Sequence, residues 1–135
     1  MINYSIAAKN LMLQAFADKL DEADPVPGRF EIYTGPLADP PGDPIGAQVL
    51  LGTIFLSLPC GVVADGVLTL DAPVADNNVA SSGTMAWGRA LNGNDVWLAD
   101  FDIGLVGSGT IFELNELTIY QGGIIRINFG TFTLS

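Results

Sequence analysis

The hydrophobic and polar positions follow a helical period only near the start of the chain. Between residues 3 and 22, apolar side chains recur every three or four positions and form one face of a helix; they are Ala8, Met12, Ala15, Phe16 and Leu20, with Leu13 beside them. Asn3 or Ser5 is suited to cap the first turn, and Pro25 and Pro27 prevent the helix from continuing. We therefore expect a helix that covers one end of the remaining fold, or one that packs as an arm on a neighbouring molecule.

From residue 29 onward the period changes to two, as in strands whose side chains alternate between two faces. The alternation predicts strands at Arg29–Tyr33, Val49–Leu58 and Ile111–Tyr120. Two hairpins are predicted from their turns: Val62–Leu70 with a tight turn at Asp65-Gly66, and Met85–Ala90 with Val96–Ile103 around a turn at Asn92-Gly93. A last strand runs through Ile125, Ile127 and Phe129 and is expected to be bulged at Gly130. Between them, the polar stretch Asp71–Gly83 is expected to cross the surface as a long connection.

About eight strands with one long crossing predict a mainly β fold, an antiparallel β-sandwich of jelly-roll-like character with one N-terminal α-helix. Residues 1–135 then form a single domain, with the helix at 3–22 and the sandwich at 29–135. Residues 36–46 contain four prolines and two aspartates. Because proline lacks a backbone donor and stiffens the chain, this segment is expected to be a stiff, exposed loop.

The charge balance excludes two classes of partner. Five Lys and Arg residues stand against fifteen Asp and Glu residues, which gives a net charge of −10. Such a chain repels the phosphates of nucleic acids and the head groups of anionic membranes. The uncharged stretch Pro44–Ala64 is long enough to cross a bilayer, but glycine, serine and proline interrupt it. We expect no nucleic-acid partner, no membrane span and, from the N-terminal residues, no signal peptide.

The residue types that most often carry catalysis are scarce. The sequence contains no histidine and one cysteine, Cys60, whose apolar neighbours predict a buried and unreactive thiol. Asp95, Asp100 and Asp102 suggest a calcium site or a sugar-hydrolysing pair, but their spacing lacks the turn glycine of a calcium loop. We therefore expect no catalytic residue, no bound metal, no cofactor and no enzymatic activity.

The two tryptophans leave a choice between core packing and ligand binding. Trp87 and Trp97 flank the expected turn at Asn92-Gly93, so they are candidates for cross-strand neighbours. Each alternates with small residues, which favours a place in the core. An exposed tryptophan would instead be typical of a surface that stacks on sugars.

The order of core and turn residues resembles a known family of small viral proteins. The matching segments are Arg29–Gly35, Leu50-Leu51 through Ile54, Leu56 and Ser57, Gly66–Thr69, Gly83-Thr84, Ala86-Trp87, Arg89-Ala90, Asn92-Gly93, Val96–Asp100 and Thr131–Leu134, preceded by a helix at Asn3–Leu20. In this pattern the chain resembles the head decoration proteins of tailed bacteriophages, which are also called cement or minor capsid proteins.

The resemblance implies a mechanical function on the virion. Such a protein is made in the host cytoplasm, docks on the outer capsid surface and bridges subunits of the major capsid protein. It also implies self-association, for which we expect a homodimer first and a homotrimer second. The expected partner-interface residues lie on the helix and the proline-rich loop: Met12, Phe16, Leu20, Asp21, Glu22, Pro40 and Pro41. The alternative function is a receptor- or glycan-binding β-sandwich module of a phage tail or fibre.

Overall fold

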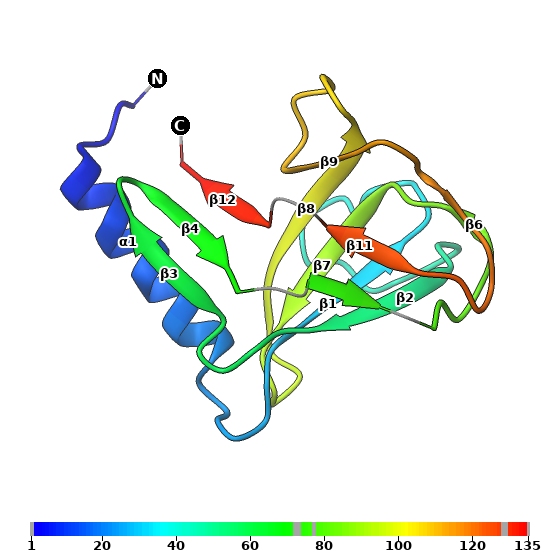
Figure 1. Ribbon diagram of the computed structural model, residues 1–135, viewed down its shortest axis with the longest axis horizontal. Helices are drawn as coiled ribbons and strands as arrows, with labels where there is room; N and C mark the ends of the chain where they lie inside the picture. The colour runs from blue at the N-terminus through cyan, green and yellow to red at the C-terminus, as the bar shows by residue number, and fades with distance from the viewer. Residues whose placement is uncertain (1, 72–73, 77, 128–129, 135) are drawn as a thin grey trace.

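One helix precedes twelve short strands in the computed structural model, which describes residues 2–71, 74–76, 78–127 and 130–134 (Figure 1). The elements are α1 (Ile6–Leu20), β1 (Arg29–Tyr33), β2 (Leu50–Phe55), β3 (Gly61–Ala64), β4 (Val67–Leu70), β5 (Val74–Asp76), β6 (Gly83–Thr84), β7 (Trp87–Leu91), β8 (Trp97–Leu105), β9 (Phe112–Leu114), β10 (Thr118–Ile119), β11 (Ile125–Ile127) and β12 (Thr131–Thr133). The predicted class, mainly β with one N-terminal helix, is confirmed, and the arrangement is consistent with a β-sandwich.

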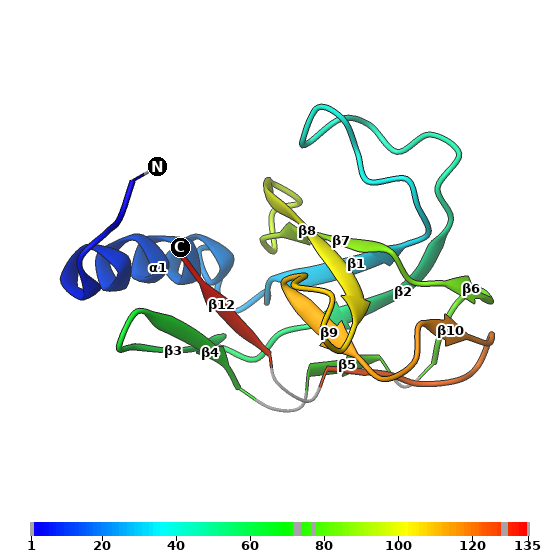
Figure 2. The ribbon, with the colours of Figure 1, turned by 90° about the horizontal axis from the view of Figure 1, so that it is seen from above.

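A curled sheet of five strands, in the order β2-β1-β7-β8-β9, forms the main layer. Smaller sheets with the orders β12-β4-β3, β11-β5 and β10-β6 complete the fold. Figure 2 shows β5 and β12 on one side of the main sheet and the loop between β1 and β2 on the other. The pairs are antiparallel except for β8 with β9, which is parallel. In the loop between these two strands, Gly107 and Gly109 have positive φ angles, and the chain doubles back along β8 there.

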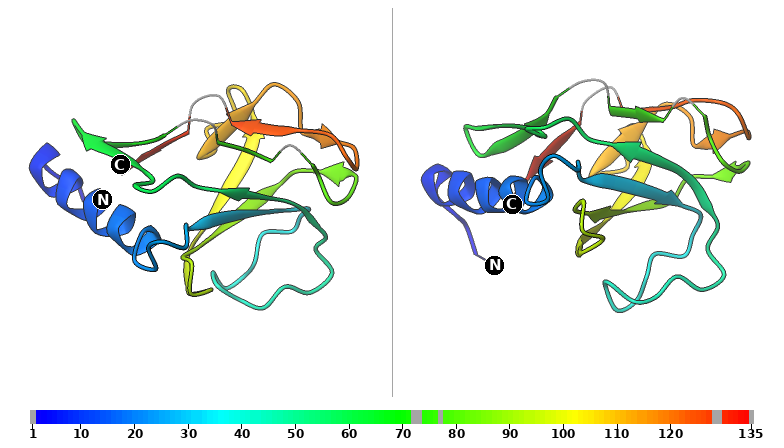
Figure 3. Two further views of the ribbon diagram at one scale, coloured as in Figure 1. Left: turned by 60° about the horizontal axis from the view of Figure 1, so that its bottom comes forward. Right: turned by 90° about the horizontal axis from the view of Figure 1, so that it is seen from below.

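The helix covers the small sheet, as the first of the two alternatives predicts. The Ser5 side chain caps it by accepting a hydrogen bond from the Ala8 backbone N–H at 3.1 Å. Its buried residues are Leu13, Ala17 and Leu20, which pack toward β3, β4 and β12 (Figures 1 and 3). The predicted apolar face was partly wrong, because Met12 and Ala15 are exposed. Leu13 is central to the contact because positions 13, 17 and 20 share the helix face that meets the sheet.

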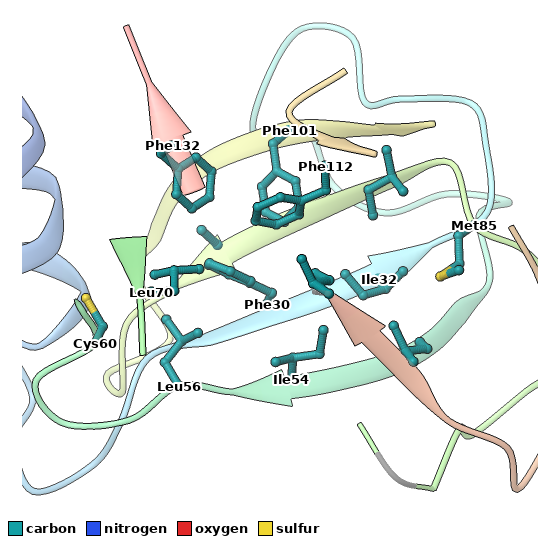
Figure 4. Close-up of a cluster of buried hydrophobic side chains, with 14 of the residues drawn as sticks. Phe30, Ile32, Ile54, Leu56, Cys60, Leu70, Met85, Phe101, Phe112 and Phe132 are labelled. Carbon is teal, nitrogen blue, oxygen red and sulfur yellow. The ribbon is translucent and has the colours of Figure 1, made fainter. Parts of the chain in front are cut away.

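Four phenylalanines form the centre of the core (Figure 4). Phe30 comes from β1, Phe101 from β8, Phe112 from β9 and Phe132 from β12, and all six pairs have ring centroids 5.0–6.0 Å apart. Most of these pairs meet edge to face, the arrangement that the charge distribution of aromatic rings favours. Phe132 thereby joins the small sheet to the main one. Phe16 of the helix contacts Phe132 at 5.5 Å and extends the cluster to α1.

One of the two predicted hairpin turns has the predicted form. At Asp65-Gly66 both residues have positive φ, as a two-residue turn between β3 and β4 requires. At Asn92-Gly93 the hairpin of β7 and β8 is present, but the turn is longer than predicted. The Asn92 side-chain oxygen accepts hydrogen bonds from the N–H groups of Asn94 and Val96. Gly93 serves close packing instead, since a side chain there would collide with the Val26 carbonyl.

Two predictions for the second half were also inaccurate, the connection at Asp71–Gly83 and the strand at Ile111–Tyr120. The stretch Asp71–Gly83 contains β5, and its Val79 is only 1% exposed, so it is not merely a surface connection. The strand predicted at Ile111–Tyr120 is divided into β9 and β10. The last predicted strand contains β11 and β12, which pair with β5 and β4 in two different sheets. Phe129, which the prediction placed in that last strand, lies outside the described residues, as does Asn77.

The burial of the helix predicts which of its leucines stabilises the fold. We expect Leu20→Ala to lower the free energy of unfolding by about 2–5 kcal/mol, because it leaves a cavity under the helix. Leu11, on the same helix, is 74% exposed, and Leu11→Ala should change stability by less than about 0.5 kcal/mol. Denaturant unfolding of both variants checks this. Equal effects of the two substitutions would contradict the observed orientation of the helix.

Candidate interaction surfaces

A row of polar side chains crosses the outer face of the main sheet, away from the phenylalanine core. Because side chains alternate along a strand, β1 directs Phe30 to the core and Glu31 to the opposite face. The strand register then places Glu31 opposite Arg89 of β7, and Arg89 opposite Asp100 of β8. Residues of three strands that are distant in sequence therefore meet in one line.

Arg89 and Asp100 form a two-pronged ion pair in this row. The Arg89 Nε lies 2.8 Å from Asp100 Oδ1, and Nη2 lies 3.1 Å from Oδ2. Their side chains are only 9% and 3% exposed. Burial alone would raise the pKa of Asp100, but hydrogen bonds from Arg89, the Gly42 N–H and the Trp97 indole hold that pKa below its ordinary value. The pair is therefore charged at neutral pH.

The same groups fix the proline-rich loop to the sheet. Figure 2 shows this loop, between β1 and β2, on one side of the main sheet. The Gly42 N–H donates to Asp100 Oδ2 at 2.8 Å, and Arg89 Nη2 donates to the Asp43 carbonyl at 2.8 Å. Buried Ala38 of the loop packs with Tyr33 and Trp87, whose rings stack with centroids 4.9 Å apart. The expected loop is thus present, and its inner side is held by a second, small core.

The two tryptophans have different environments. Trp87 is fully buried, as predicted, and its indole N–H donates to the Thr34 carbonyl at 2.9 Å. Trp97 is 42% exposed, so its predicted place in the core was wrong. The cause is a bulge: Ala90 pairs with Ala99 but Leu91 pairs with Trp97, which leaves one extra residue in β8.

The bulge moves Trp97 to the outer face of the sheet, where its ring lies against Gly42. The two tryptophans are not cross-strand neighbours, since Trp87 pairs with Asp102. Both rings therefore contact the loop, and of the two only the Trp97 ring is accessible from solvent.

The three aspartates of β8 and its turn do not gather into one site. Asp95 binds Arg29 at 2.7 Å, Asp100 binds Arg89, and Asp102 accepts the Ile111 N–H at 2.7 Å. Within the residues that the structure describes, no group of three or more His, Cys, Asp or Glu side chains could hold a metal ion. Each carboxylate instead satisfies a cation or a backbone donor of the fold.

Cys60 is buried, as its neighbours predict. Burial is the main cause that raises the pKa of its thiol to about 12, and the nearby Asp21 carboxylate adds to the effect. At neutral pH the thiol is therefore protonated and a poor nucleophile.

A second surface is an apolar groove between α1, β8 and β12. Its volume is about 330 Å³, and its lining includes Met12, Leu13, Phe16, Phe101, Ile111 and Phe132. Phe101 and Phe132 also belong to the core cluster, so the groove opens directly above the centre of the fold.

In the described part of the chain, no helix is long and apolar enough to span a membrane.

The predicted interface residues fall into four places. Met12 and Phe16 line the groove, and Pro40 and Pro41 are exposed on the loop. Leu20 is completely buried in the chain's own core, so it supports the fold and offers no contact to a partner.

The remaining two lie at the end of the helix. Asp21 is half-buried and accepts the Cys60 N–H at 3.2 Å. Glu22 is exposed and pairs with Lys19 at 2.9 Å. Sequence reasoning did not identify Ile111 and Thr133 as surface candidates, because their exposure depends on strand pairing. It considered Trp97 as part of a sugar-stacking surface but favoured the core, because the bulge that exposes this ring follows from the pairing of β7 with β8.

Comparisons with known proteins add no relative. The chain matches no protein-family model, no curated protein and no solved structure.

The ion pair predicts a pH-dependent contribution to stability. The folded-state pKa of Asp100 lies below the ordinary 3.8, so its stabilising effect is complete above that value and is lost as the pH falls through the folded-state pKa. We expect Asp100→Asn to destabilise the protein at neutral pH by about 3–5 kcal/mol, because Arg89 remains buried without a counter-charge. The variant should also lose less stability than the wild type on acidification from about pH 5 to about pH 2.

The matched control is Asp95→Asn, which removes an exposed carboxylate from its pair with Arg29. We expect it to change stability by at most about 1 kcal/mol. Urea unfolding of the three proteins at several pH values measures both effects. Parallel pH profiles for the wild type and Asp100→Asn would contradict the assignment.

Proposed function

We propose that this protein is a structural virion protein that docks on the outer surface of the capsid and stabilises the major capsid protein lattice, as a decoration or cement protein. Its partners are then the major capsid protein and further copies of itself, in a homodimer first and a homotrimer second. The proposal starts from the resemblance of the core and turn residues described above.

The observation that carries the proposal is that the potentially reactive side chains are engaged within the fold, whereas large apolar side chains are exposed. The side chains that could carry chemistry instead take part in the folded structure: Asp100 binds Arg89, Asp95 binds Arg29, and Cys60 is buried. Large apolar side chains are meanwhile exposed, among them Leu11, Phe55 and Tyr120. A chain with few charges and exposed apolar residues is suited to assembly.

The proline-rich loop supports docking through its rigidity. Four prolines, the Gly42–Asp100 hydrogen bond and the buried Ala38 limit the conformations of its backbone. A loop that is ordered before binding loses less conformational entropy when it meets a partner. Exposed Pro40 and Pro41 would then contact the capsid without a large ordering penalty.

The mechanism of stabilisation is mass action. A ligand that binds only the assembled lattice stabilises it by RT ln(1 + [L]/Kd) at each site. Many symmetric copies therefore convert a modest contact into a stable shell. No catalytic residue takes part in this mechanism.

The proposal predicts how particles respond to salt and heat. The chain carries ten excess negative charges but is 49% hydrophobic, so we expect apolar contact to dominate binding. Particles should retain the protein in about 1 M salt, where the Debye length is only about 3 Å. Particles that lack it should release their DNA at a lower temperature. Sedimentation after salt washes and thermal release of DNA measure both. Elution at moderate salt, or equal heat resistance without the protein, would contradict the proposal.

One observation favours the alternative, a receptor- or glycan-binding module. Trp97 is exposed, its indole N–H donates to Asp100 at 3.0 Å, and Asp95 lies two residues earlier in the turn before β8. Aromatic rings flanked by hydrogen-bonding side chains are suited to stack on sugars. Gly42 covers part of the Trp97 ring, however, so less of the ring face is available to a sugar than on a fully exposed tryptophan.

A glycan array separates the two functions. If the alternative holds, the protein binds a defined glycan, and Trp97→Ala abolishes that binding while Trp97→Phe retains part of it. Phe55→Ala removes another exposed aromatic ring, 62% exposed, and serves as the control. Under the decoration proposal we expect no glycan to bind, and specific binding that depends on Trp97 would replace that proposal.

A further inference from the structure

Among the residues that the structure describes, the short strand β12 pairs with β4 along one edge and with no strand along the other, which is its free edge. The Leu70 N–H donates to the Gly130 carbonyl at 2.8 Å, and the register then pairs Phe132 with Leu68. In an antiparallel ladder the bonded and non-bonded pairs alternate. The backbone groups of Thr131 and Thr133 therefore point away from β4, toward the groove between β12 and β8.

The opposite wall of the groove is also a strand edge. The Ile103 N–H donates to the Ala86 carbonyl at 3.0 Å, so by the same alternation the backbone of Asp100 points away from β7. β9 pairs with β8 only from Ile103 to Leu105. Among the described residues, no strand pairs with the preceding part of β8 on this side. Figures 1 and 2 show β12 between β4 and β8, with its free edge turned to β8.

The far edge of the main sheet is protected. Asp76 Oδ2 accepts the Thr53 N–H of β2 at 2.9 Å, and the Leu51 carbonyl accepts the N–H groups of Ala80 and Ser81. Proteins block exposed edges in such ways because a free edge pairs with other chains. Along the groove, by contrast, the lining residues include neither lysine nor proline.

We propose that the groove binds an extended segment of a different chain, which pairs with the free edge of β12 as an added strand. The apolar floor of Met12, Phe101 and Phe132 would receive alternate side chains of that segment, because successive residues of a strand face opposite sides. This is β-augmentation, in which the backbone supplies affinity and the floor supplies specificity.

Charge identifies the class of segment. The protein carries a net charge of −10, and a second copy would bring the same charge to the contact. The one charged residue that lines the groove, Asp100, has its carboxylate turned to Arg89. A segment with lysine or arginine between its apolar residues is therefore attracted, and one with acidic residues is repelled. That the segment belongs to a capsid subunit rests on the proposed function.

A defined peptide tests the groove without a capsid. The probe is Lys-Val-Thr-Ile-Lys-Val-Thr-Val-Lys, compared with the same peptide N-methylated at alternate residues and with a version in which glutamate replaces lysine. We expect the first peptide to bind and to shift the NMR amide signals of Thr131, Thr133 and Asp100. N-methylation should abolish binding, because it removes the donors of an added strand. The acidic peptide should bind at least about tenfold more weakly at low salt.

Two variants locate the site on the protein. Thr133→Pro removes an N–H that faces the groove and is not part of the pairing with β4, and Met12→Lys places a charge on the apolar floor. Each should weaken binding of the basic peptide by about tenfold or more. Leu11→Lys makes the same change on an exposed helix position outside the lining and should leave binding unchanged.

The outcomes separate this inference from the proposed function. Equal binding of the methylated peptide, no binding of the basic peptide, or an equal loss with Leu11→Lys would overturn the inference. A homodimer that Thr133→Pro converts to a monomer would also overturn it, since a second copy would then occupy the edge. If the protein binds the basic peptide but does not bind capsids, the decoration proposal is contradicted, and the inference that the groove binds an added strand still holds. If the Thr133→Pro and Met12→Lys variants bind capsids as well as the wild type does, the groove is not the capsid docking site, and the decoration proposal still holds.

Discussion

The contact among Phe30, Phe101, Phe112 and Phe132 is the interaction on which the rest of the structure depends. Each ring comes from a different strand, and the strands belong to two separate sheets. Strands as short as β9 and β12 make few backbone hydrogen bonds, so side-chain packing must hold them in place. The helix joins the same cluster through Phe16. In the described part of the chain no strand pairs with the second edge of β12, so its phenylalanine ring holds this strand beside the groove.

The opposite face of the same strands solves a different physical problem. There β1, β7 and β8 present charged and polar groups, and the loop between β1 and β2 covers them. Burying Arg89 and Asp100 removes both charges from water, a penalty that attraction in the interior offsets only with good geometry and further hydrogen bonds. Asp100 has these from Gly42 and Trp97. The pair therefore contributes a defined position for the loop more than it contributes net stability.

Local sequence patterns predicted the features that local physics determines. The period-two alternation of Arg29–Tyr33 and the positive-φ turn at Asp65-Gly66 depend on neighbouring residues, and both are confirmed. The bulge that exposes Trp97 arises from pairing between β7 and β8. Val79 is buried in the core, and its backbone exchanges hydrogen bonds with Gly122 and Gly123, which lie far along the chain. Such features require knowledge of the partner strand. The same limit applies to the groove. Met12 could be predicted from the sequence as an interface residue, but the free strand edges beside it follow from the order of the strands in the sheets.

Asp100 connects the two surfaces, because its carboxylate holds the loop on one face while its backbone lines the groove. A strand added in the groove would have to find β8 and β12 already in place, since ordering an edge on binding reduces affinity. The ion pair with Arg89 fixes β8 at this residue, and the phenylalanine cluster fixes β12 at Phe132. Any change that loosens the loop would then also loosen one wall of the groove, and by thermodynamic linkage a strand bound in the groove would tighten the loop. If the groove binds a strand as proposed, the buried charges on one face and the open edge on the other would both help to order the binding surface in advance.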